Sequence, residues 1–597
     1  MLPRVNNSDP DADTSLAANF YLSSASPAPR LRIGLLIDTP EIPAVFARVI
    51  SDIQRSDFAD VVCVIRNMDA KPPSSIQSLP RRVWKFLSSP KVRQAILYAV
   101  YVKLDEWRSY DPQLDPLKPV DCSSFLRGIP QISVFPATSG PVHRFSEADI
   151  AQVKAADLDV IVRFGFNILK GDILGAARYG VWSYHHGDND LYRGSPPYMW
   201  EMMEGSPRCG AVLQILTETL DGGLVIAKGQ YACESAVSLF RNRLGPFWGS
   251  CYFLVWKLRE LHEKGFPALR ATAVPRADYG GRKALYSKPG NREMLGWMWR
   301  LLVRKLGQKR ARRMLHWQTA LRRNAVSSAL HPASGSLDLS GFQFLKAPAG
   351  HFYADPFLFE RDGRTFLFME DYDYAAARGD LVVMDVTDGV PEQAEPCLAT
   401  GSHLSYPFVF AHGGEIWMIP ESMAAGEVAL YRAEAFPHRW VKEKVLFSGP
   451  VVDTTVWQKD GTWYFFATLI VPGTEAVSLH LFTADSLTGD WRLHPASPLS
   501  NDVRDARGAG RLFMQDGVLY RPAQDCSGTY GRAIRLFRVD EHTPSTYAES
   551  LVMEVGPQDV PHFAGRGAEG IHTYDRAGTF EVIDAKFSLP VTEVLGG

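Results

Sequence analysis

The 597-residue chain lacks several features that would assign it quickly to a functional class. It has no apolar run of about 18 residues, and its first residues lack the basic-then-apolar order of a secretion signal. Its seven cysteines form no Cys-x-x-Cys pair, which favours reduced thiols over a disulfide framework. The net charge of −2 provides no overall basic surface for nucleic acid. We therefore expect a cytoplasmic protein whose partners are small molecules rather than nucleic acid.

Length and composition predict a multidomain chain, because 597 residues exceed what one hydrophobic core normally serves. Residues 1–29 are rich in Asp, Ser, Ala, Pro and Asn, which predicts a disordered leader. Residues 30–268 show the pattern of an α/β domain, in which residues 80–136 are predicted to be a helical insertion that shapes a pocket. The remainder is predicted to be a basic helical linker, 269–340, and an all-β domain, 341–597.

The α/β domain opens with a strand, a helix and a second strand, at Leu31–Asp38, Ile42–Ile53 and Ala59–Ile65. This order predicts a Rossmann-type parallel sheet, although no Gly-x-Gly-x-x-Gly follows the first strand to indicate a dinucleotide. Asp159–Leu169 is a further buried strand that leads into a loop. Ligands bind at the carboxyl ends of strands in such sheets, so the segment that follows is where we expect a site.

That segment, Gly180–Gly194, holds an unusual density of polar residues, among them His185, His186, Asp188 and Arg193. Such a cluster is costly to bury unless it is used. The alternative is that the two histidines are structural and are satisfied by nearby aspartates, Asp188 and Asp190.

The spacing Gly-x-x-x-x-His, then Arg-Gly, and further on Leu-Asp-x-Gly at residues 220–223, resembles the formyltransferase family that uses 10-formyltetrahydrofolate. The resemblance covers roughly residues 31–265. One position departs, because this chain has Ser183 where the family has an asparagine. The resemblance implies catalytic roles for His185, Asp221 and Ser183, and substrate binding by His186, Asp188, Arg193 and Gly194.

The chemistry of formyl transfer explains these residue types. An amine that attacks a formyl carbon creates an oxyanion and must lose a proton, so the site needs a hydrogen-bond donor and a base. His185 can donate to the oxyanion, and Asp221 can orient the imidazole and accept the proton. Loss of one oxyanion donor typically costs about 100- to 1,000-fold in rate. Ser183 therefore implies a displaced substrate, a replacement donor such as His186 or Asn189, or a weakened enzyme.

Residues 282–323 are strongly basic, with Glu293 as their single acid, and their basic residues alternate with tryptophans and aliphatic residues. This pattern predicts an amphipathic helix. It suits either a connector packed between domains or a helix that makes peripheral contact with an anionic membrane.

From residue 355 onward the chain repeats a strand, a tight turn that ends in glycine, and a second strand. Asp-Gly between apolar runs is a strong hairpin signal, and the spacing of the units is typical of propeller blades. We therefore predict a five-bladed β-propeller with units that begin at Asp355–Gly363, Tyr406–Gly414, Asp453–Gly461, Ala509–Gly517 and Gly570–Gly578.

The first strands begin on polar residues, and the second strands end on Glu370, Glu421, Thr468, Gln524 and Asp584. If the first strands line the central channel, these ends bring acids and aromatic residues together in one mouth, as sugar binding and glycosidic chemistry require. The predicted carbohydrate site consists of Asp355, Glu370, Tyr406, Glu421, Asp453 and Asp525. No metal is predicted, because His351, His403 and His562 lack ligand spacing.

Two resemblances extend this interpretation. The tract Tyr353–Phe357 resembles the opening of five-bladed glycosidases, which implies that Asp355 is a general base. Residues 340–590 resemble the N-terminal region of glucosamine inositolphosphorylceramide transferases, through the tracts His403–Pro407, Ile419–Ser422, Val452–Thr455 and Arg507–Gly510.

Together these features predict an enzyme that moves a formyl group from 10-formyltetrahydrofolate to an amine, in particular that of an amino sugar recognised by the propeller. Two alternatives stay open. In one, the formyltransferase-like domain has lost folate chemistry, as Ser183 suggests, and is fused to a glycan-binding or glycan-transferring propeller. In the other, the propeller is a glycosidase whose acid and base are Glu421 and Asp355.

Overall fold

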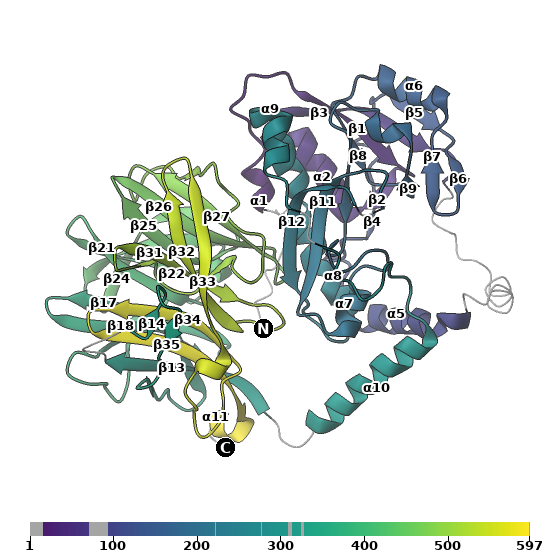
Figure 1. Ribbon diagram of the computed structural model, residues 1–597. Coiled ribbons are helices and arrows are strands. Elements are labelled where there is room, and N and C mark those ends of the chain that lie inside the picture. Colours follow the sequence, from purple (N-terminus) through teal and green to yellow (C-terminus); the bar gives the residue numbers. More distant parts are fainter. Residues whose placement is uncertain are drawn as a thin grey trace. The chain divides into compact units, whose positions relative to one another are not determined.

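A computed structural model describes residues 16–70, 93–220, 222–275, 278–308, 313–323 and 328–595 (Figure 1). The chain divides into two compact units, which we call the α/β unit (Asp13–Lys305) and the β unit (Leu306–Gly597). No helix within these described ranges is both long enough and apolar enough to cross a bilayer.

The α/β unit is built on one seven-stranded sheet with the order β12-β11-β10-β8-β1-β3-β5. The strands β5, β3, β1, β8 and β10 are parallel, whereas β11 runs antiparallel to β10 and to β12. The central strands are apolar along most of their length, as expected for strands covered on both faces. This confirms the predicted parallel sheet, whose strands are β12 (Leu224–Ala232), β11 (Arg208–Ile215), β10 (Val181–His185), β8 (Val160–Arg163), β1 (Leu31–Ile37), β3 (Ala59–Asn67) and β5 (Gln131–Val134).

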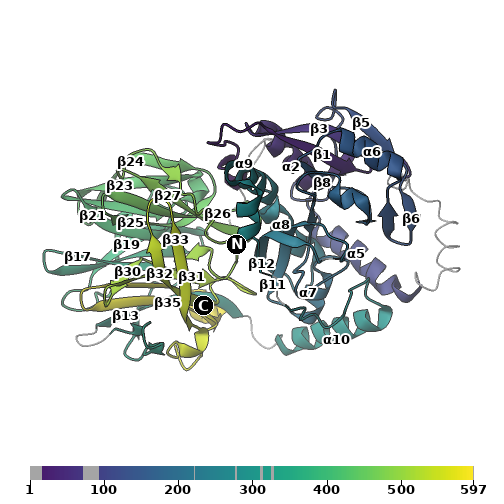
Figure 2. The ribbon, with the colours of Figure 1, turned by 45° about the horizontal axis from the view of Figure 1, so that its top comes forward.

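Helices pack against this sheet and its edges (Figure 2). In α2, Val45, Val49 and Ile53 recur at helical spacing and are buried, because one face of an amphipathic helix covers the core. Ser146 caps α6 by accepting a hydrogen bond from Asp149 N. The helices are α2 (Ala44–Arg55), α6 (Glu147–Ala155), α7 (Met199–Glu204), α8 (Leu239–Ser250) and α9 (Phe253–Ala271).

The prediction of a disordered leader is wrong for residues 16–29, which include the short helix α1 (Leu16–Asn19), while residues 1–15 lie outside the described residues. Tyr21 is buried, and its ring stacks on that of Tyr252 with centroids 5.8 Å apart. Ser24 Oγ lies 2.7 Å from Nδ1 of His262 in α9. One buried aromatic residue thus orders a segment whose average composition is that of a disordered chain.

The predicted insertion also contributes to the core. Its helix α5 (Ile96–Ser109) is followed by β4 (Pro119–Asp121), which pairs with β2 (Glu41–Pro43), and then by β5, an edge strand of the main sheet. The insertion interpretation is therefore wrong for residues 131–134, and residues 80–92 lie outside the described residues.

The predicted basic linker contains both a helix and a strand. Residues Asn291–Gln308 form the predicted helix, α10, whereas Arg313–Arg323 form strand β13, which pairs along its whole length with β35 (Phe580–Pro590). Arg322, one of the basic residues assigned to the helix, is buried in an ion pair with Glu581, with a separation of 2.5 Å between Nη2 and Oε2. Backbone pairing with a strand that is distant in sequence determines the secondary structure of Arg313–Arg323, and local composition does not reveal that pairing.

Four antiparallel sheets follow one another along the β unit, and another joins β13 to the C-terminal strands in the order β16-β13-β35-β34. The first strands of successive sheets contact each other, and β34 contacts β17, so the series returns to its start. The strands of the first two sheets are β17 (His351–Arg361), β18 (Arg364–Asp373), β19 (Arg378–Asp385), β20 (Glu395–Leu398), β21 (Ser405–His412), β22 (Glu415–Glu421), β23 (Glu427–Ala435) and β24 (Arg439–Ser448). The others are β25 (Val451–Lys459), β26 (Thr462–Ile470), β27 (Val477–Ala484), β28 (Arg492–Leu493), β29 (Arg507–Gly508), β30 (Phe513–Gln515), β31 (Val518–Asp525), β32 (Ala533–His542), β33 (Tyr547–Val555), β34 (Gly570–Ala577) and β16 (Gln343–Phe344).

The hairpin turns confirm the predicted repeat. Asp362 and Gly363 join β17 to β18 with φ values of 51° and 74°, and Asp460 and Gly461 join β25 to β26 with 50° and 82°. Two consecutive left-handed residues are what a two-residue hairpin turn requires, which explains the recurring Asp-Gly. The fold of the β unit is therefore propeller-like.

Candidate functional site

The carboxyl ends of the parallel strands form the first candidate site, in the α/β unit. Asp38, directly after β1, accepts a hydrogen bond of 2.8 Å from Asn67 Nδ2 at the end of β3. Both of its carboxylate oxygens also accept from Phe166 N, in the loop after β8, at 3.1 Å. The loops that follow three neighbouring strands thus meet at the edge where ligands bind in open α/β sheets.

Ser183 is engaged in hydrogen bonds within the sheet. It lies on β10 opposite Arg163 of β8 and is only 1% exposed. Its Oγ accepts a hydrogen bond of 3.0 Å from Arg163 Nε and donates one of 3.2 Å to Tyr184 O. Arg163 Nη1 also donates to Asn167 O at 2.9 Å. The hydroxyl hydrogen is therefore committed, which contradicts the expectation that Ser183 itself replaces the asparagine as oxyanion donor, and a guanidinium lies at this strand end instead.

The two histidines that end β10 differ in their surroundings. His185 is half-buried, with Nε2 3.2 Å from Tyr192 O. The ring of His186 stacks on Phe247, with centroids 3.7 Å apart and planes inclined by 26°. Burial, with a smaller contribution from His185, lowers the pKa of His186 to about 3, so its imidazole is neutral at physiological pH.

Asp188, predicted to bind substrate, is held by the sheet. Its Oδ1 lies 2.7 Å from Lys228 Nζ, and its Oδ2 accepts a hydrogen bond of 2.7 Å from Gln230 Nε2. Asp190 Oδ2 pairs with the same lysine at 2.7 Å. The aspartates therefore pair with β12 rather than with the histidines, against the alternative that they satisfy His185 and His186.

Arg193 and Gly194 shape the loop. Arg193 Nε donates to Asn189 O at 2.9 Å, and its guanidinium lies 4.2 Å from the centroid of the Tyr279 ring. Gly194 has a φ of 107° and forms a bridge with Tyr286, whose carbonyl oxygen would lie 2.2 Å from a Cβ at this position. Glycine is required here by both conformation and close approach. Asp221, the predicted catalytic aspartate, lies outside the described residues.

Several buried polar atoms around the strands β10 and β11 have no hydrogen-bond partner within the described part of the chain. Burial raises the pKa of one of these groups, Glu201, to about 8. More than nine in ten buried polar groups normally have a partner, so a cluster of exceptions indicates a place for a polar ligand. The atoms are Nδ1 and Nε2 of His186, Oδ1 of Asn189, Oδ1 of Asp190, Oε1 of Glu201 and Oε1 of Gln214.

The second candidate site lies in the β unit, where a β-bulge recurs at the start of the first strands. Asp355, Tyr406 and Asp453 have φ values of 48°, 46° and 46°, and the register of each hairpin shifts at these residues. A left-handed residue other than glycine costs about 1–3 kcal/mol, and such strain clusters at functional positions. Because a bulge changes the direction of a side chain, its repetition turns equivalent residues in successive sheets.

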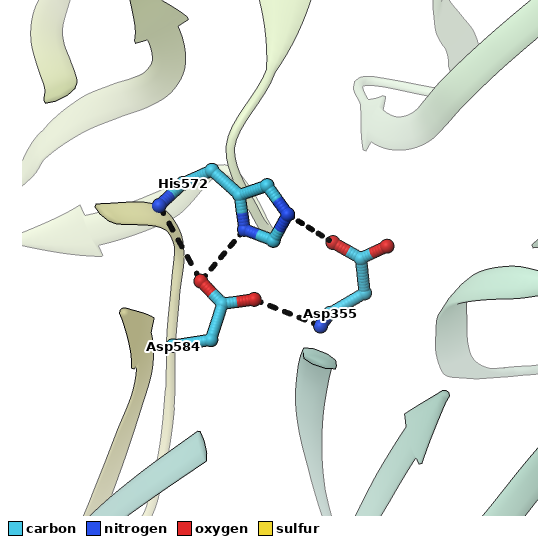
Figure 3. Close-up of side chains that lie close together, drawn as sticks. All are labelled: Asp355, His572 and Asp584. Carbon is cyan, nitrogen blue, oxygen red and sulfur yellow. Dashed lines mark hydrogen bonds and ion pairs between the residues drawn. The ribbon is translucent and has the colours of Figure 1, made fainter. Parts of the chain in front are cut away.

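The first group in this site joins Asp355 to two residues of the last hairpin, as Figure 3 shows. His572 Nδ1 lies 2.7 Å from Asp584 Oδ1, and its Nε2 lies 3.7 Å from Asp355 Oδ1. Asp355 N donates to Asp584 Oδ2 at 2.9 Å. Burial lowers the pKa of His572, but Asp584 and Asp355 outweigh burial and raise it overall. Trp317 stacks on the imidazole with centroids 3.7 Å apart.

Asp355, His572 and Asp584 each offer one ligand atom, and these atoms all lie within 4.8 Å of one another. The arrangement can therefore hold either a protonated imidazole between two carboxylates or a divalent cation. The histidines considered from sequence lie elsewhere: His351 pairs with Asp371 at 2.9 Å.

The second group surrounds Asp453. Its Oδ2 forms a short ion pair with Arg507 and accepts a hydrogen bond of 3.2 Å from Gln524 Nε2. The Arg507 guanidinium also lies 4.7 Å from the centroid of the Tyr530 ring. The predicted meeting of first-strand starts and second-strand ends is thus present here, with an arginine between them.

The third group contains Glu370 and Glu421. His403 Nε2 lies 3.7 Å from Glu370 Oε1 and 3.9 Å from Glu421 Oε2. Burial and the nearby Asp453 raise the pKa of Glu421 to about 7. Burial, Asp355 and Glu421 raise that of Glu370. Mutual influence on pKa places the predicted acids of several sheets close together.

Tyr406 and Asp525 depart from their predicted roles. The Tyr406 hydroxyl accepts a hydrogen bond of 2.8 Å from Gly510 N, so it supports the backbone of a neighbouring sheet. Asp525 accepts from Ser527 N at 2.7 Å and pairs with Arg532, which makes its assignment to the carbohydrate site wrong. Successive strand residues face opposite sides, and the residue that faces Asp453 is Gln524.

Sequence reasoning did not identify Arg163, His572 or Trp317 as site residues. A basic residue that ends an otherwise apolar strand was the available signal for Arg163. His572 lies at the bulge of the last hairpin, but aligning the repeats on their glycines places it at the position of Phe357, so the repeat did not indicate it. Trp317 gave no signal, because its segment looked helical.

Comparison with known proteins relates the β unit to one family. The N-terminal region of glucosamine inositolphosphorylceramide transferase 1 matches residues 332–567. The rice protein of that name (Oryza sativa subsp. japonica) is 40% identical over 205 residues, which are 33% of this chain and 28% of the rice protein. The Arabidopsis thaliana protein is 35% identical over the same length, covering 27% of its own chain.

The other matches are weaker and are to formyltransferases and to a glycosidase. A methionyl-tRNA formyltransferase of Synechococcus sp. (strain WH7803) is 38% identical over 71 residues, 12% of this chain and 21% of that enzyme. Among solved structures, glycinamide ribonucleotide transformylase 1 of Symbiobacterium toebii covers 39% of this chain and 87% of its own, at 13% identity and a TM-score of 0.25. A family 117 glycoside hydrolase of Zobellia galactanivorans covers 46% and 91%, at 11% identity and a TM-score of 0.29. The chain thus combines a segment similar to formyltransferases with a segment similar to part of the plant glucosamine inositolphosphorylceramide transferases, and it spans less than a third of those plant relatives.

Proposed function

We propose that the α/β unit transfers a formyl group from 10-formyltetrahydrofolate to an amine, and that the β unit, a five-bladed propeller, recognises a carbohydrate. An amino sugar is the acceptor that suits both units, because it supplies the amine and the hydroxyls together. The observation that carries this proposal is the His185-His186 pair at the carboxyl end of β10, in a motif that resembles the formyltransferases and contains buried polar atoms of His186, Asn189 and Asp190 without a hydrogen-bond partner among the described residues.

The described residues fit a folate in chemical type. A neutral imidazole can donate and accept, and the side-chain amides of Asn189 and Gln214 can do the same, as a polar pteridine ring requires. The aromatic stack of His186 on Phe247 is an apolar surface at the end of the same strand. Sites for small cofactors typically combine apolar walls with a few polar groups of this kind.

Formyl transfer forms a bond between the amine nitrogen and the formyl carbon and breaks the bond from that carbon to the folate nitrogen. The attacking amine loses a proton, and the departing folate nitrogen gains one. We assign His185 as the hydrogen-bond donor to the formyl oxygen, because it ends β10 at the ligand edge of the sheet. Arg163 provides positive charge at the same edge, where the resembling family has a neutral amide. The predicted base is Asp221.

The β unit contributes recognition in this proposal. Buried carboxylates such as Glu370 and Glu421, whose pKa values are raised, are better satisfied by a cationic or hydroxyl-rich ligand than by one another. A protonated amino sugar offers both kinds of donor.

The test is binding of 10-formyl-5,8-dideazafolate, a stable analogue, to the full chain by titration calorimetry. We expect micromolar affinity for the wild type and about tenfold or greater weakening in His186→Phe, which keeps the stack on Phe247 and removes both ring nitrogens. Tyr179→Phe serves as a matched aromatic control. Absence of binding by the folded wild-type chain would exclude folate chemistry.

The second candidate function is glycan binding or transfer by the β unit without formyl chemistry. The engagement of Ser183 by Arg163 favours it, since the fixed neutral donor of the family is missing. Binding of glucosamine-containing oligosaccharides that survives Asp38→Ala and His185→Ala, in a chain that does not bind the folate analogue, would support this function.

Glycosidic cleavage by Asp355 and Glu421 is less consistent with the structure. Asp355 is buried and lies against His572 and Thr573. Asp453, a further acid of this site, forms an ion pair with Arg507. A general base for water needs an open approach.

A further inference from the structure

Helix α10 leaves an apolar stripe uncovered. Met294 and Trp297 are buried against the α/β unit, and Arg300 Nη2 donates to Met203 O at 3.1 Å. A second stripe on the same helix recurs at the i, i+3, i+4, i+7 and i+8 positions and faces away from that contact. Its residues, Leu295, Met298, Trp299, Leu302 and Val303, are 47% to 66% exposed.

Helix α5 repeats this pattern beside α10. It buries Tyr98 and Asp105, whereas Val100, Leu104 and Trp107, at the i, i+4 and i+7 positions, lie on its outer side, and Trp107 is 86% exposed. The two helices contact each other, since the Tyr101 ring meets Trp297 edge-on with centroids 5.1 Å apart. Both ribbon views show them as neighbours (Figures 1 and 2). Together the exposed stripes form what we call the α5–α10 face.

Basic side chains border this face. Lys103 and Arg108 lie among or beside the apolar residues of α5 in sequence, and Arg292, Arg304 and Lys305 flank those of α10. The two helices carry three acids: Asp105 is buried, Glu106 pairs with Lys103, and Glu293 pairs with Lys283 at 2.5 Å. The local excess of positive charge contrasts with the net charge of −2 for the whole chain.

We propose that the α5–α10 face docks on an anionic phospholipid surface. Exposed tryptophans and aliphatic residues bordered by lysine and arginine match the boundary between acyl chains and charged headgroups. Exposed apolar residues concentrated on neighbouring helices mark an interaction site, and the basic border selects an anionic partner over a neutral one. Docking is parallel to the surface, with α5 and α10 as the inserted elements.

The experiment is flotation of the full-length chain with vesicles of phosphatidylcholine, with and without phosphatidylglycerol. We expect binding only to the anionic vesicles, with weakening as salt increases. The paired variant Trp299→Glu with Leu302→Glu should reduce the partition coefficient about tenfold or more, and Arg304→Glu with Lys305→Glu should do so as well. The control is Leu551→Glu, on β33 and 44% exposed, which should bind like the wild type.

Two other occupants are outcomes that would overturn the proposal. A second copy of the chain would appear in sedimentation velocity as a dimer that the Trp299 and Leu302 variant dissociates. Cover by another part of the same chain would appear as failure of the folded wild type to float, with a lower melting temperature in the same variant. Equal loss of flotation in the Leu551 control would also count against a specific face.

Discussion

The two candidate sites treat buried charge in opposite ways. In the β unit, Asp453 meets Arg507, and Asp584 meets His572, so each of these carboxylates has a cation from its own chain. In the α/β unit, buried polar atoms of His186, Asn189 and Gln214 have no hydrogen-bond partner among the described residues. Asp453 and Asp584 are therefore paired within the chain, whereas these polar atoms of the α/β unit are available to a ligand.

This difference separates structural from binding roles. An internally paired cluster fixes side-chain directions before a ligand arrives, as preorganised recognition requires. Unpartnered groups cost stability unless a ligand satisfies them, so they are expected where binding energy is needed. The β unit therefore suits recognition by shape and charge, and the α/β unit suits a ligand that contributes to the site.

The largest expected effect would test the chemistry of the α/β site. His185→Ala should lower kcat for formyl transfer to amino-sugar nucleotides by about 100- to 10,000-fold, because the proposed donor to the formyl oxygen is lost. The measurement is release of tetrahydrofolate followed by absorbance. Unchanged turnover would contradict the assignment of His185 as the hydrogen-bond donor to the formyl oxygen.

The next effect would break the internal pairing of the β unit. Arg507→Met leaves Asp453 buried beside its remaining partner Gln524, and the free energy of unfolding should fall by about 3–5 kcal/mol. Chemical denaturation measures the change. The control Arg361→Met removes an exposed pair with Asp362 and should cost less than about 1 kcal/mol. Similar losses in both would contradict the view of Asp453 as an internally neutralised acid.

Arg163→Met addresses the residue that most distinguishes this α/β site. It removes the guanidinium beside Ser183 without changing the strand, and kcat should fall by about 100-fold while the Kd for the folate analogue changes little. The control is Arg178→Met, whose side chain is 61% exposed. A rise in turnover would contradict the role of Arg163 as the positive charge that assists transfer.

The smallest effect compares the pH dependence of the two sites. Glu421 has a pKa raised to about 7 from 4.5, so its contribution to stability is present at low pH and is lost as pH rises through about 7. His186 has a pKa lowered to about 3 from 6.5, so its contribution is present above 6.5 and is lost as pH falls. Glu421→Gln should therefore stabilise the chain most at alkaline pH, and His186→Phe should do so most at acid pH, each by about 2–3 kcal/mol. Denaturant titrations at several pH values measure the free energy of unfolding of each variant. The same pH dependence in both variants would contradict the predicted opposite trends.

Prediction from sequence succeeded where the structure depends on a local pattern of residues. The Asp-Gly turns predicted the hairpins because only left-handed residues close a two-residue loop. The motif around His185 predicted a site at the end of a strand, and β10 does end there. It gave no indication of the contacts of Ser183, whose Oγ accepts a hydrogen bond from Arg163 on a neighbouring strand and donates one to Tyr184 O. Prediction failed for Asp525, because a shift of one residue along a strand reverses the face.

The sequence by itself determined the local patterns. These are the apolar runs of the parallel sheet, the histidine motif after one of its strands, and the repeated hairpins of the β unit. Tertiary structure alone decided the pairings, since these depend on residues far apart in the chain. It joined β13 to β35, His572 to Asp355, and Arg507 to Asp453. Short-range preferences are encoded locally, whereas the partner of a buried charge is chosen by whichever strand the fold brings beside it.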